Sequence, residues 1–562
     1  MNWRTPVQRK VAAHELSESD SVIARVLAAR GVIVDEQRAL ALSQLAPVSS
    51  LGGIDAAAQL LQAHRAQTIV IVGDFDADGA TSAALLMRGL RALGFSSVSS
   101  LVPNRFEFGY GLSPEIVDVA LQRAPSLIVT VDNGISSVDG VAHARAHGIE
   151  VLVTDHHLPP KQLPDATVIV NPNANGDDFS SKALAGVGVA FYVLAALERA
   201  LVPQGAASAG VAASLLDLVA LGTVADVVPL DRNNRILVNA GLQRIRAGAC
   251  APGISALLRL AGRDPKRCSA ADLGFAAGPR LNAAGRLDDM SIGIHCLLAD
   301  SAHEADSAAR ALDQINRDRR ELEQDMHESA LRHIDAVSDP ALPPACVCLY
   351  ESDWHQGVVG LVASRIKERL HRPVFAFADD GQGALKGSGR SIAGVHLRDV
   401  LAEVDRRIPG TISKFGGHAM AAGLTLGQDG LAVFTQVVAD VVASQTDPQL
   451  FEPTILTDGH LADHHLTLEF AERLAACGPY GQQFAEPCFE GRFAVAESRI
   501  VGEQHLKLTL ADGIDAIAFR QVREPLPRKG EYLELVYRLD INEWRGRRSV
   551  QLIIDQWRHS NA

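Results

Sequence analysis

Residues 68–94 read TIVIVGDFDADGATSAALLMRGLRALG, and this stretch decides the fold class. The run TIVIVG has the length and β-branched composition of a buried strand. The following GATSAALLMRGLRALG, residues 79–94, places apolar side chains at helical spacing. We therefore expect a strand that leads through an acidic turn into a helix.

The same unit recurs further along the chain. SLIVTV (126–131) precedes the helical pattern GISSVDGVAHARAHG (134–148), and EVLVT (150–154) and TVIVNP (167–172) supply two more strands. Strands that alternate with helices predict a parallel sheet with helices on both faces. Residues 183–245 continue as helices rich in Ala, Leu and Val.

The second half of the chain changes character twice. Glu304 to Ile334 has the pattern of one long helix with a charged face that includes Arg319 and Glu323. A second α/β region starts at CVCLY (346–350), and the chain is β-rich from Phe451, as in a small barrel. The apolar stripe predicted for the long helix consists of Ala308, Leu312, Ile315, Leu322, Met326 and Ala330.

The composition is that of a globular, cytoplasmic protein with several domains. The chain has 562 residues, of which 47% are hydrophobic and 21% charged. It shows no signal peptide and no apolar run of membrane-spanning length, so we expect no membrane association. The seven cysteines have no CxxC spacing, which is typical of a reducing compartment. The net charge of −13 excludes little, because nucleic-acid binding depends on where the charge lies.

Three aspartates follow the first strand. In an extended segment, Asp74, Asp76 and Asp78 point the same way, so their carboxylates converge. Such a cluster repels itself unless a cation binds to it. An acidic turn that satisfies backbone amides is the alternative for an isolated pattern of this kind.

Similar side chains follow the later strands, which favours the metal site. Asp132 ends one strand, and Asp155, His156 and His157 end the next. The carboxyl ends of parallel strands share one rim, and Asp226 after an apolar helix can reach it. Oxygen ligands with one or two imidazoles suit Mn²⁺ or Mg²⁺ better than zinc. Adjacent residues of an extended segment point in opposite directions, so we expect His156 to bind metal and His157 to face substrate phosphate or lie behind the ligands.

At these residues the chain resembles the DHH phosphoesterase superfamily, named for the triplet Asp155-His156-His157. Within it, the match is to bacterial exonucleases specific for single-stranded DNA. It covers the chain from about residue 40 to the end, with Phe75 where the family usually has Tyr. The further motifs are PNRFEFGYGL (103–112), GPRLNAAGR (278–286), WHQGVVGLVASR (354–365), SGRS (388–391) and FGGHAMAAG (415–423).

The resemblance implies two divalent cations, Mn²⁺ or Mg²⁺. Asp76 and Asp78 would bind separate metals, Asp132 would bridge them, and Asp74, His156 and Asp226 would complete the ligand set. It also implies a catalytic set of Asp76, Asp78, Asp132, His156 and His157.

The same resemblance implies a substrate site around the scissile and terminal phosphates. Its members would be Arg105, Arg280, Ser388, Arg390 and His418, and we predict that Tyr110 and Arg286 bind substrate as well. Guanidinium groups suit this role because they bind phosphate oxygens in a bidentate way. Phe106, Phe108 and Tyr110 can stack on bases or form the core of their own loop, and the sequence leaves both readings open.

The carboxy-terminal β region resembles an OB-fold. Trp544 with Arg545, Arg547 and Arg548 offers an aromatic platform and positive charge for a strand. A solvated hairpin is the alternative reading of such a charged run.

We therefore predict a multidomain α/β enzyme that removes mononucleotides from single-stranded DNA in the 5′→3′ direction, in recombination and repair. The expected partners are single-stranded DNA, a single-stranded-DNA-binding protein and a helicase, and the expected state is a monomer. The alternatives are a DHH phosphodiesterase acting on short oligonucleotides or cyclic dinucleotides, and a non-catalytic DNA-binding scaffold. The predicted parts are an N-terminal extension (1–50), a DHH catalytic parallel-sheet domain (51–300), a connecting helix (301–338), a DHHA1-like α/β domain (339–446) and an OB-fold β-barrel (450–562).

Overall fold

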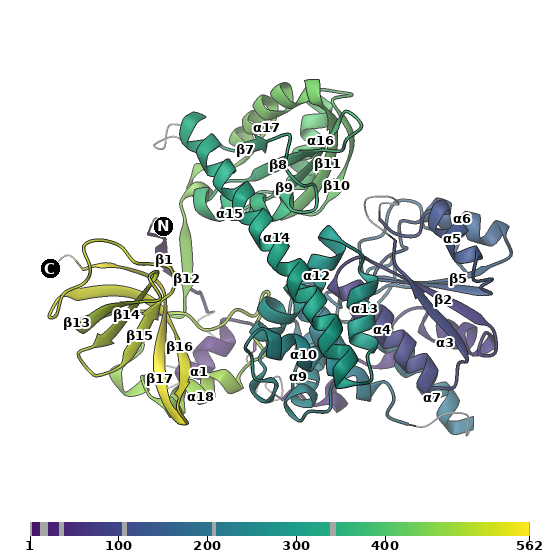
Figure 1. Cartoon of the computed structure of the whole chain (residues 1–562), viewed down its shortest axis with the longest axis horizontal. Helices are drawn as coiled ribbons and strands as arrows, with labels where there is room; N and C mark the ends of the chain where they lie inside the picture. The colour runs from purple at the N-terminus through teal and green to yellow at the C-terminus, as the bar shows by residue number, and fades with distance from the viewer. Residues whose placement is uncertain are drawn as a thin grey trace.

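The computed structural model describes residues 3–11, 21–32, 39–103, 110–204, 209–337 and 344–560. Figure 1 shows three bodies: the first domain in purple to teal, the second in green and the third in yellow. The long helix α14 (Ala302–Val337) runs from the first domain to the second. This arrangement matches the predicted fold class.

The first domain is built on a five-stranded parallel sheet, as the alternation of strands and helices predicts. The strand order is β3-β2-β4-β5-β6. The strands are β2 (Thr68–Gly73), β3 (Ser97–Leu101), β4 (Leu127–Val131), β5 (Glu150–Thr154) and β6 (Val168–Val170).

Helices cover both faces of this sheet. Along β2, Ile69 and Ile71 join one apolar cluster, while Val70 and Val72 join another. The first cluster includes α3 (Ile54–Ala63), α4 (Ala77–Ala92) and α7 (Gly186–Leu201), and the second includes α5 (Pro114–Leu121) and α6 (Val138–Ala146). Because both faces are buried, the central strands β2 and β4 are almost entirely apolar instead of alternating, whereas the edge strand β3 has three serines.

A layer of helices extends the first domain beyond the sheet. It contains a π-helical turn, η6 (Leu273–Ala277), between two α-helices. The helices of this layer are α8 (Leu216–Ala225), α9 (Arg232–Arg246), α10 (Pro252–Leu260), α11 (Ala270–Asp272), α12 (Gly278–Leu287) and α13 (Ser291–Leu298).

Helix α14 packs on the first domain with its amino-terminal half and on the second with its carboxy-terminal half. Leu312 belongs to the core of the first domain, and Met326 and Ala330 belong to a cluster with α15 (Val359–Leu370). The charged face differs from the expectation, because Arg319 and Glu323 are buried. Glu323 accepts hydrogen bonds from Arg319 and, at 3.0 Å, from Arg365 of α15.

The second domain is a mixed sheet of order β10-β11-β9-β8-β7, in which only β7 and β8 are parallel. Helices α15, α16 (Leu397–Arg407) and α17 (Leu431–Gln445) pack on it. The strands are β7 (Val347–Tyr350), β8 (Val374–Asp379), β9 (Ala384–Arg390), β10 (Ile412–Gly417) and β11 (Ala421–Gly427).

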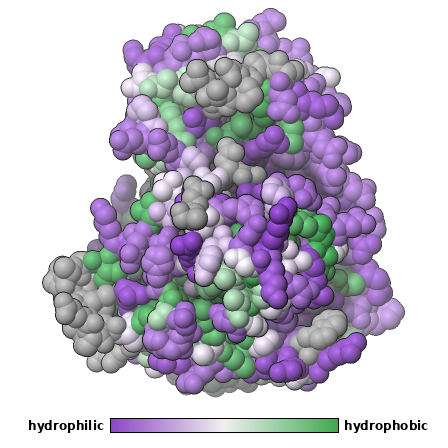
Figure 2. Space-filling view, turned by 90° about the vertical axis from the view of Figure 1, so that its left-hand side faces the viewer, coloured by the Kyte–Doolittle hydropathy of each residue, from purple (hydrophilic) through white to green (hydrophobic). Residues whose placement is uncertain are grey.

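In the third domain, five strands form the closed ring that the β-rich pattern predicts. The strands are β13 (Phe489–Val501), β14 (His505–Leu510), β15 (Asp515–Ala518), β16 (Tyr532–Trp544) and β17 (Arg547–His559). Helix α18 (Leu468–Ala476) packs against β16 and β17. Seen from the side of this domain, the surface is mostly hydrophilic with small apolar areas interspersed (Figure 2).

The amino-terminal residues tie the third domain to the first. Strand β1 (Thr5–Gln8) pairs in parallel with β12 (Thr454–Thr457), the segment that leads into the third domain. Arg30, just after α1 (Val22–Ala28), donates two hydrogen bonds to Asp458. Within the described residues, no helix is both long and apolar enough to cross a membrane.

Candidate metal centre

The acidic segment after β2 adopts a different conformation from the extended one assumed from sequence. Helix α4 begins at Ala77, so Asp76 caps it and Asp78 lies in its first turn. The Asp76 carboxylate accepts hydrogen bonds from the Asp78 and Gly79 amides at 2.9 and 3.0 Å. A Cβ on Gly79 would lie 2.5 Å from the Asp74 carbonyl oxygen, so only glycine permits this tight entry into the helix. The premise of an extended segment was therefore wrong.

Backbone amides of α7 fix the Asp78 side chain. Its two carboxylate oxygens accept hydrogen bonds from Gly186 and Val187 at 2.7 and 2.9 Å. These amides belong to the first turn of α7, where helix N–H groups have no partner within the helix and attract negative charge. No local pattern indicates this contact, because the two segments are more than 100 residues apart.

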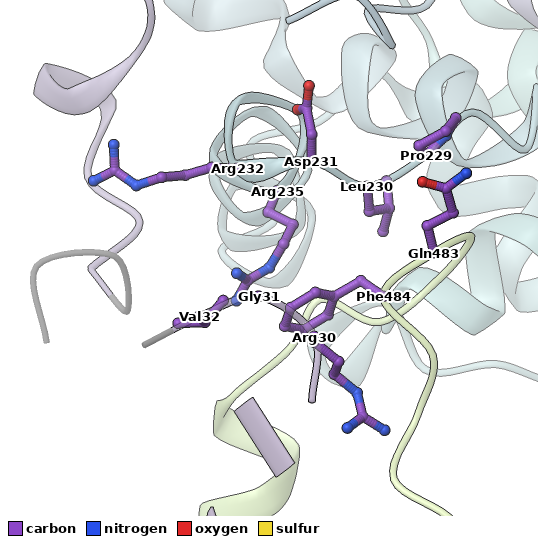
Figure 3. A pocket seen from close by; sticks show the side chains of 10 residues that line it. All are labelled: Arg30, Gly31, Val32, Pro229, Leu230, Asp231, Arg232, Arg235, Gln483 and Phe484. Atoms are coloured by element: carbon purple, nitrogen blue, oxygen red, sulfur yellow. The ribbon is translucent and has the colours of Figure 1, made fainter. Parts of the chain in front are cut away.

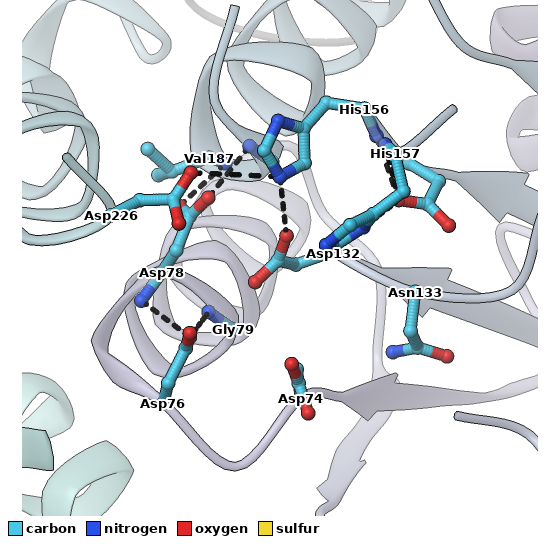
Figure 4. A network of polar contacts seen from close by, with 12 residues as sticks. Asp74, Asp76, Asp78, Gly79, Asp132, Asn133, His156, His157, Val187 and Asp226 are labelled. Carbon is cyan, nitrogen blue, oxygen red and sulfur yellow. Dashed lines mark hydrogen bonds and ion pairs between the residues drawn. The ribbon is translucent and has the colours of Figure 1, made fainter. Parts of the chain in front are cut away.

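Asp132 stands directly after β4 in a left-handed backbone conformation, with φ of 61°. Aspartate tolerates this region better than most residues. The side chain is buried, and its Oδ1 lies 3.2 Å from His156 Nε2. The same nitrogen lies 3.5 Å from Asp226 Oδ2, at the carboxy-terminal cap of α8. Figure 4 shows His156 above this pair of carboxylates, with Asp132 at the centre of the cluster.

The two histidines after β5 face different partners. Burial and the nearby charge of His157 lower the pKa of His156 to about 4, so its imidazole is neutral, the form that binds metal. His157 Nδ1 lies 2.7 Å from Asp155 Oδ1. Burial lowers the pKa of His157, but the Asp155 contact outweighs it and raises the value to about 9. Asp155 also accepts hydrogen bonds from the amides of Ile135, His156 and His157, so it positions the histidine segment.

The electrostatics of this cluster fit cations. Burial and the neighbouring carboxylates raise the pKa of Asp78 and of Asp132, and burial with the charge of Asp76 raises that of Asp226 to about 7. Asp132 Oδ1, His156 Nε2 and Asp226 Oδ2 are buried without a hydrogen-bond partner among the described residues. Buried polar atoms rarely stay unpaired, so the donor set fits divalent cations.

Three overlapping groups bring their ligand atoms within 4.8 Å of one another. They contain all six predicted ligands, and His157 as well. The groups are Asp74 with Asp76 and Asp132; Asp78 with His156 and Asp226; and Asp132 with His156 and His157.

Two of the predicted substrate residues, Tyr110 and His418, lie close to this cluster. The Tyr110 hydroxyl donates to the Asp132 carbonyl at 3.2 Å and lies 3.3 Å from His157 Nδ1. His418, from the second domain, has its pKa lowered by burial and then by the charge of His157, so it lies near enough to His157 to respond to that charge. Arg390 is half-buried on β9 and donates to Ser388 at 3.0 Å.

The other predicted substrate residues have different surroundings. Arg280 is buried and donates to Asp313 of α14 and to the Ala276 carbonyl, so it joins helices. Arg286 donates to the Gly357 carbonyl of the second domain at 3.2 Å. Arg545 lies in the two-residue turn between β16 and β17, directly after Trp544. Arg105, with Phe106 and Phe108, lies outside the described residues.

A separate cavity of about 250 Å³ lies between the first and third domains (Figure 3). The buried Arg235 guanidinium lies 3.7 Å from the centre of the Phe484 ring and donates to the Cys477 carbonyl. None of the predicted site residues lines this cavity.

Each of the three domains matches the model of a known protein family. Residues 68–223 match the DHH family, N-terminal domain; residues 344–444 match the DHHA1 domain; and residues 457–556 match the RecJ OB domain. The single-stranded-DNA-specific exonuclease RecJ of Salmonella typhimurium is 51% identical over 576 residues, covering 98% of this chain and 99% of that protein.

Two solved structures of RecJ from Thermus thermophilus have the same architecture. The structure in complex with Mn²⁺ is 31% identical with a TM-score of 0.81, and covers 99% of this chain and 80% of that chain. The structure in complex with Mg²⁺ is 29% identical with a TM-score of 0.75, and covers 99% and 78%.

Proposed function

The chain belongs to the RecJ family of single-stranded-DNA-specific exonucleases, and from that premise we propose that it degrades single-stranded DNA by metal-dependent phosphodiester hydrolysis. The observation that carries the proposal is the convergence of buried ligand atoms of Asp132, His156 and Asp226, in which the His156 nitrogen lies 3.2 and 3.5 Å from the two carboxylate oxygens and none of the three atoms has a hydrogen-bond partner among the described residues. A scaffold without catalysis has no need of such a costly cluster.

Two divalent cations, Mn²⁺ or Mg²⁺, would supply Lewis acidity and lower the pKa of water toward neutrality. The proposed ligands are held in advance by their surroundings: Asp76 by the first turn of α4, and Asp78 by the amides of Gly186 and Val187. Asp132 and His156 each belong to two of the three ligand groups, and of the two only the carboxylate has two oxygens to offer, which supports a bridging role for Asp132. The other proposed ligands are Asp74, His156 and Asp226.

His157 is proposed to contact the substrate phosphate. Its Nδ1 is committed to Asp155, so the assignment falls on Nε2, and the bond to Asp155 fixes the orientation of the ring. Tyr110 packs edge-on against His157, with ring centres 5.9 Å apart, and adds a second fixed contact.

The direction of digestion is proposed to be 5′→3′, with release of mononucleotides. Ser388 and Arg390 lie on β9 of the second domain, and His418 of the same domain lies near enough to His157 for that charge to lower its pKa. Burial lowers the pKa of Arg390, and its guanidinium donates to a hydroxyl and a carbonyl, which leaves its charge for an incoming terminal phosphate. Arg105 is proposed for the same pocket from the sequence alone.

The wider setting is also a proposal. We expect a cytoplasmic monomer that acts in recombination and repair with a single-stranded-DNA-binding protein and a helicase. Sedimentation of the purified protein with and without each partner tests the assembly.

The proposed activity is tested by release of acid-soluble nucleotides from single- and double-stranded DNA. With Mn²⁺ we expect release from single strands, little from blunt duplex, and none when a chelator replaces the metal. Equal digestion of both DNA forms, or undiminished digestion in the chelator, would contradict the proposal. Digestion only of oligonucleotides a few nucleotides long would favour the short-substrate phosphodiesterase.

A further inference from the structure

The three most exposed large apolar side chains of the described residues are Phe275, Val227 and Leu158. They are 81%, 62% and 58% exposed, respectively. Single exposed apolar residues are common on protein surfaces. Two of these three directly follow proposed site residues in the sequence, and the third belongs to an element that packs against the helix capped by Asp226.

Val227 follows the proposed ligand Asp226, and Leu158 follows His157. Asp226 and His157 lie on opposite sides of the cluster in Figure 4. Phe275 belongs to η6, which packs along the end of α8. A Cβ on Gly274 would lie 3.1 Å from Val224, and one on Gly278 would lie 3.1 Å from Ala225.

The backbone at this place is unusual in two respects. Val227 has φ of 62°, a left-handed conformation that is strained for a β-branched residue and that glycine adopts freely. Phe275 lies in a five-residue π-helical turn, a feature that often marks functional sites. Both departures leave an apolar side chain exposed to solvent, at Val227 directly after the proposed ligand Asp226 and at Phe275 in the turn that packs on the same end of α8, so folding alone does not account for them.

We propose that Phe275, Val227 and Leu158 form an apolar rim that contacts the nucleobases flanking the scissile phosphate, with Phe275 as the stacking surface. The inference rests on the proposed function, because a phosphodiester held at the cluster carries its bases within reach of these side chains. The rim contacts bases through their faces, so it binds every base and requires that the base be unpaired.

The test compares normal and abasic DNA. Single-turnover digestion of a 5′-phosphorylated single strand is measured against enzyme concentration, with intact bases or with abasic residues at its first three positions. For the unaltered protein, abasic substitution should raise the half-saturating concentration by about 5- to 150-fold, the range for stacking on one base. Phe275→Ala should bind normal DNA correspondingly less tightly and lose most of the difference between the two DNAs.

Two further variants separate the loss of base contacts from a loss of protein stability. Val227→Gly relieves the left-handed strain, so it should melt no lower than the unaltered protein while also losing part of the discrimination. Val433→Ala, which removes a 49% exposed side chain on α17, should retain it fully. Unchanged discrimination in Phe275→Ala would overturn the proposal, as would an equal loss of affinity for both DNAs. Failure of the unaltered protein to digest either DNA would instead contradict the proposed function.

Discussion

At the scale of single residues, Asp132 and His156 are the two members of the centre that belong to more than one ligand group. Asp132 lies within reach of Asp74, Asp76, His156 and His157, in a buried position at a strand end. His156 links two parts of the centre, because its Nε2 lies close to carboxylate oxygens of both Asp132 and Asp226. The chemistry therefore depends on very few atoms.

Asp132→Ala should reduce hydrolysis by at least about 10³-fold while leaving the fold intact, because loss of a bridging ligand disables both proposed metals. Single-turnover rates in saturating Mn²⁺, together with circular dichroism, provide the measurement. Asp325→Ala, at an exposed position of α14, is the control. Activity close to that of the control would exclude Asp132 as a shared ligand.

The pKa of Asp226, about 7, predicts how removal of the metal affects stability. A raised carboxyl pKa means that the folded protein binds a proton that the unfolded chain releases near pH 4. The contribution of the Asp226 carboxyl to the free energy of unfolding is therefore fully present below about pH 4, and it is lost as the pH rises from about 4 to 7. Metal-free protein should lose melting temperature over pH 5 to 7.5, and saturating Mn²⁺ should remove most of that loss. Parallel melting curves for Asp226→Asn and the unaltered metal-free protein would contradict this account.

At the scale of elements, the strand pattern predicted the edge of the sheet at which the acidic residues gather. Parallel strands that alternate with helices have all their carboxyl ends at one edge. The sequence did not predict that the helix begins at Ala77. The segment GDFDADG is compatible with an extended strand end and with a helix cap, and only the close packing of Gly79 against the Asp74 backbone decides between them. The buried pairs Arg280–Asp313 and Arg319–Glu323 could not be foreseen, because a charged helix face normally meets solvent.

Glu323 joins α14 to α15, and we expect it to contribute strongly to the free energy of unfolding. Glu323→Ala leaves the buried Arg319 without its carboxylate, at a cost of about 3–5 kcal/mol. Arg365→Ala removes the 58% exposed partner of the same carboxylate and should cost about 0–1 kcal/mol. Urea unfolding followed by circular dichroism compares the two. Equal losses would mean that Glu323 is held mainly by Arg365.

At the scale of the whole molecule, the third domain is attached to the first through buried contacts. Asp458 pairs with Arg30, and both side chains are 2% exposed, while Phe484 lies beneath Arg235. A truncation near Thr446 would remove these partners of both arginines and weaken the catalytic domain. The sequence pattern predicted a β-rich third domain but not these contacts. Surface substitutions are therefore the better test of its role in DNA binding.

Arg545 and Arg547 are exposed at the hairpin between β16 and β17. If each contacts one phosphate, replacing both by alanine should lower the slope of log affinity against log salt by about 1.4 on long single strands. Replacing Arg528 and Lys529, exposed on another loop of the same domain, is the charge-matched control. A slope unchanged relative to the unaltered protein would favour partner docking as the role of this hairpin.

The most direct test of the central claim follows the two ends of one single strand at once. Linear DNA labelled with different dyes at its 5′ and 3′ ends, and a circle of the same sequence, are digested with Mn²⁺. We predict immediate release of the 5′ dye as a mononucleotide, late release of the 3′ dye, and an intact circle. Mononucleotide release beginning at the 3′ end, or cutting of the circle at the rate of the linear strand, would contradict a centre that seats a 5′ end beside its metals.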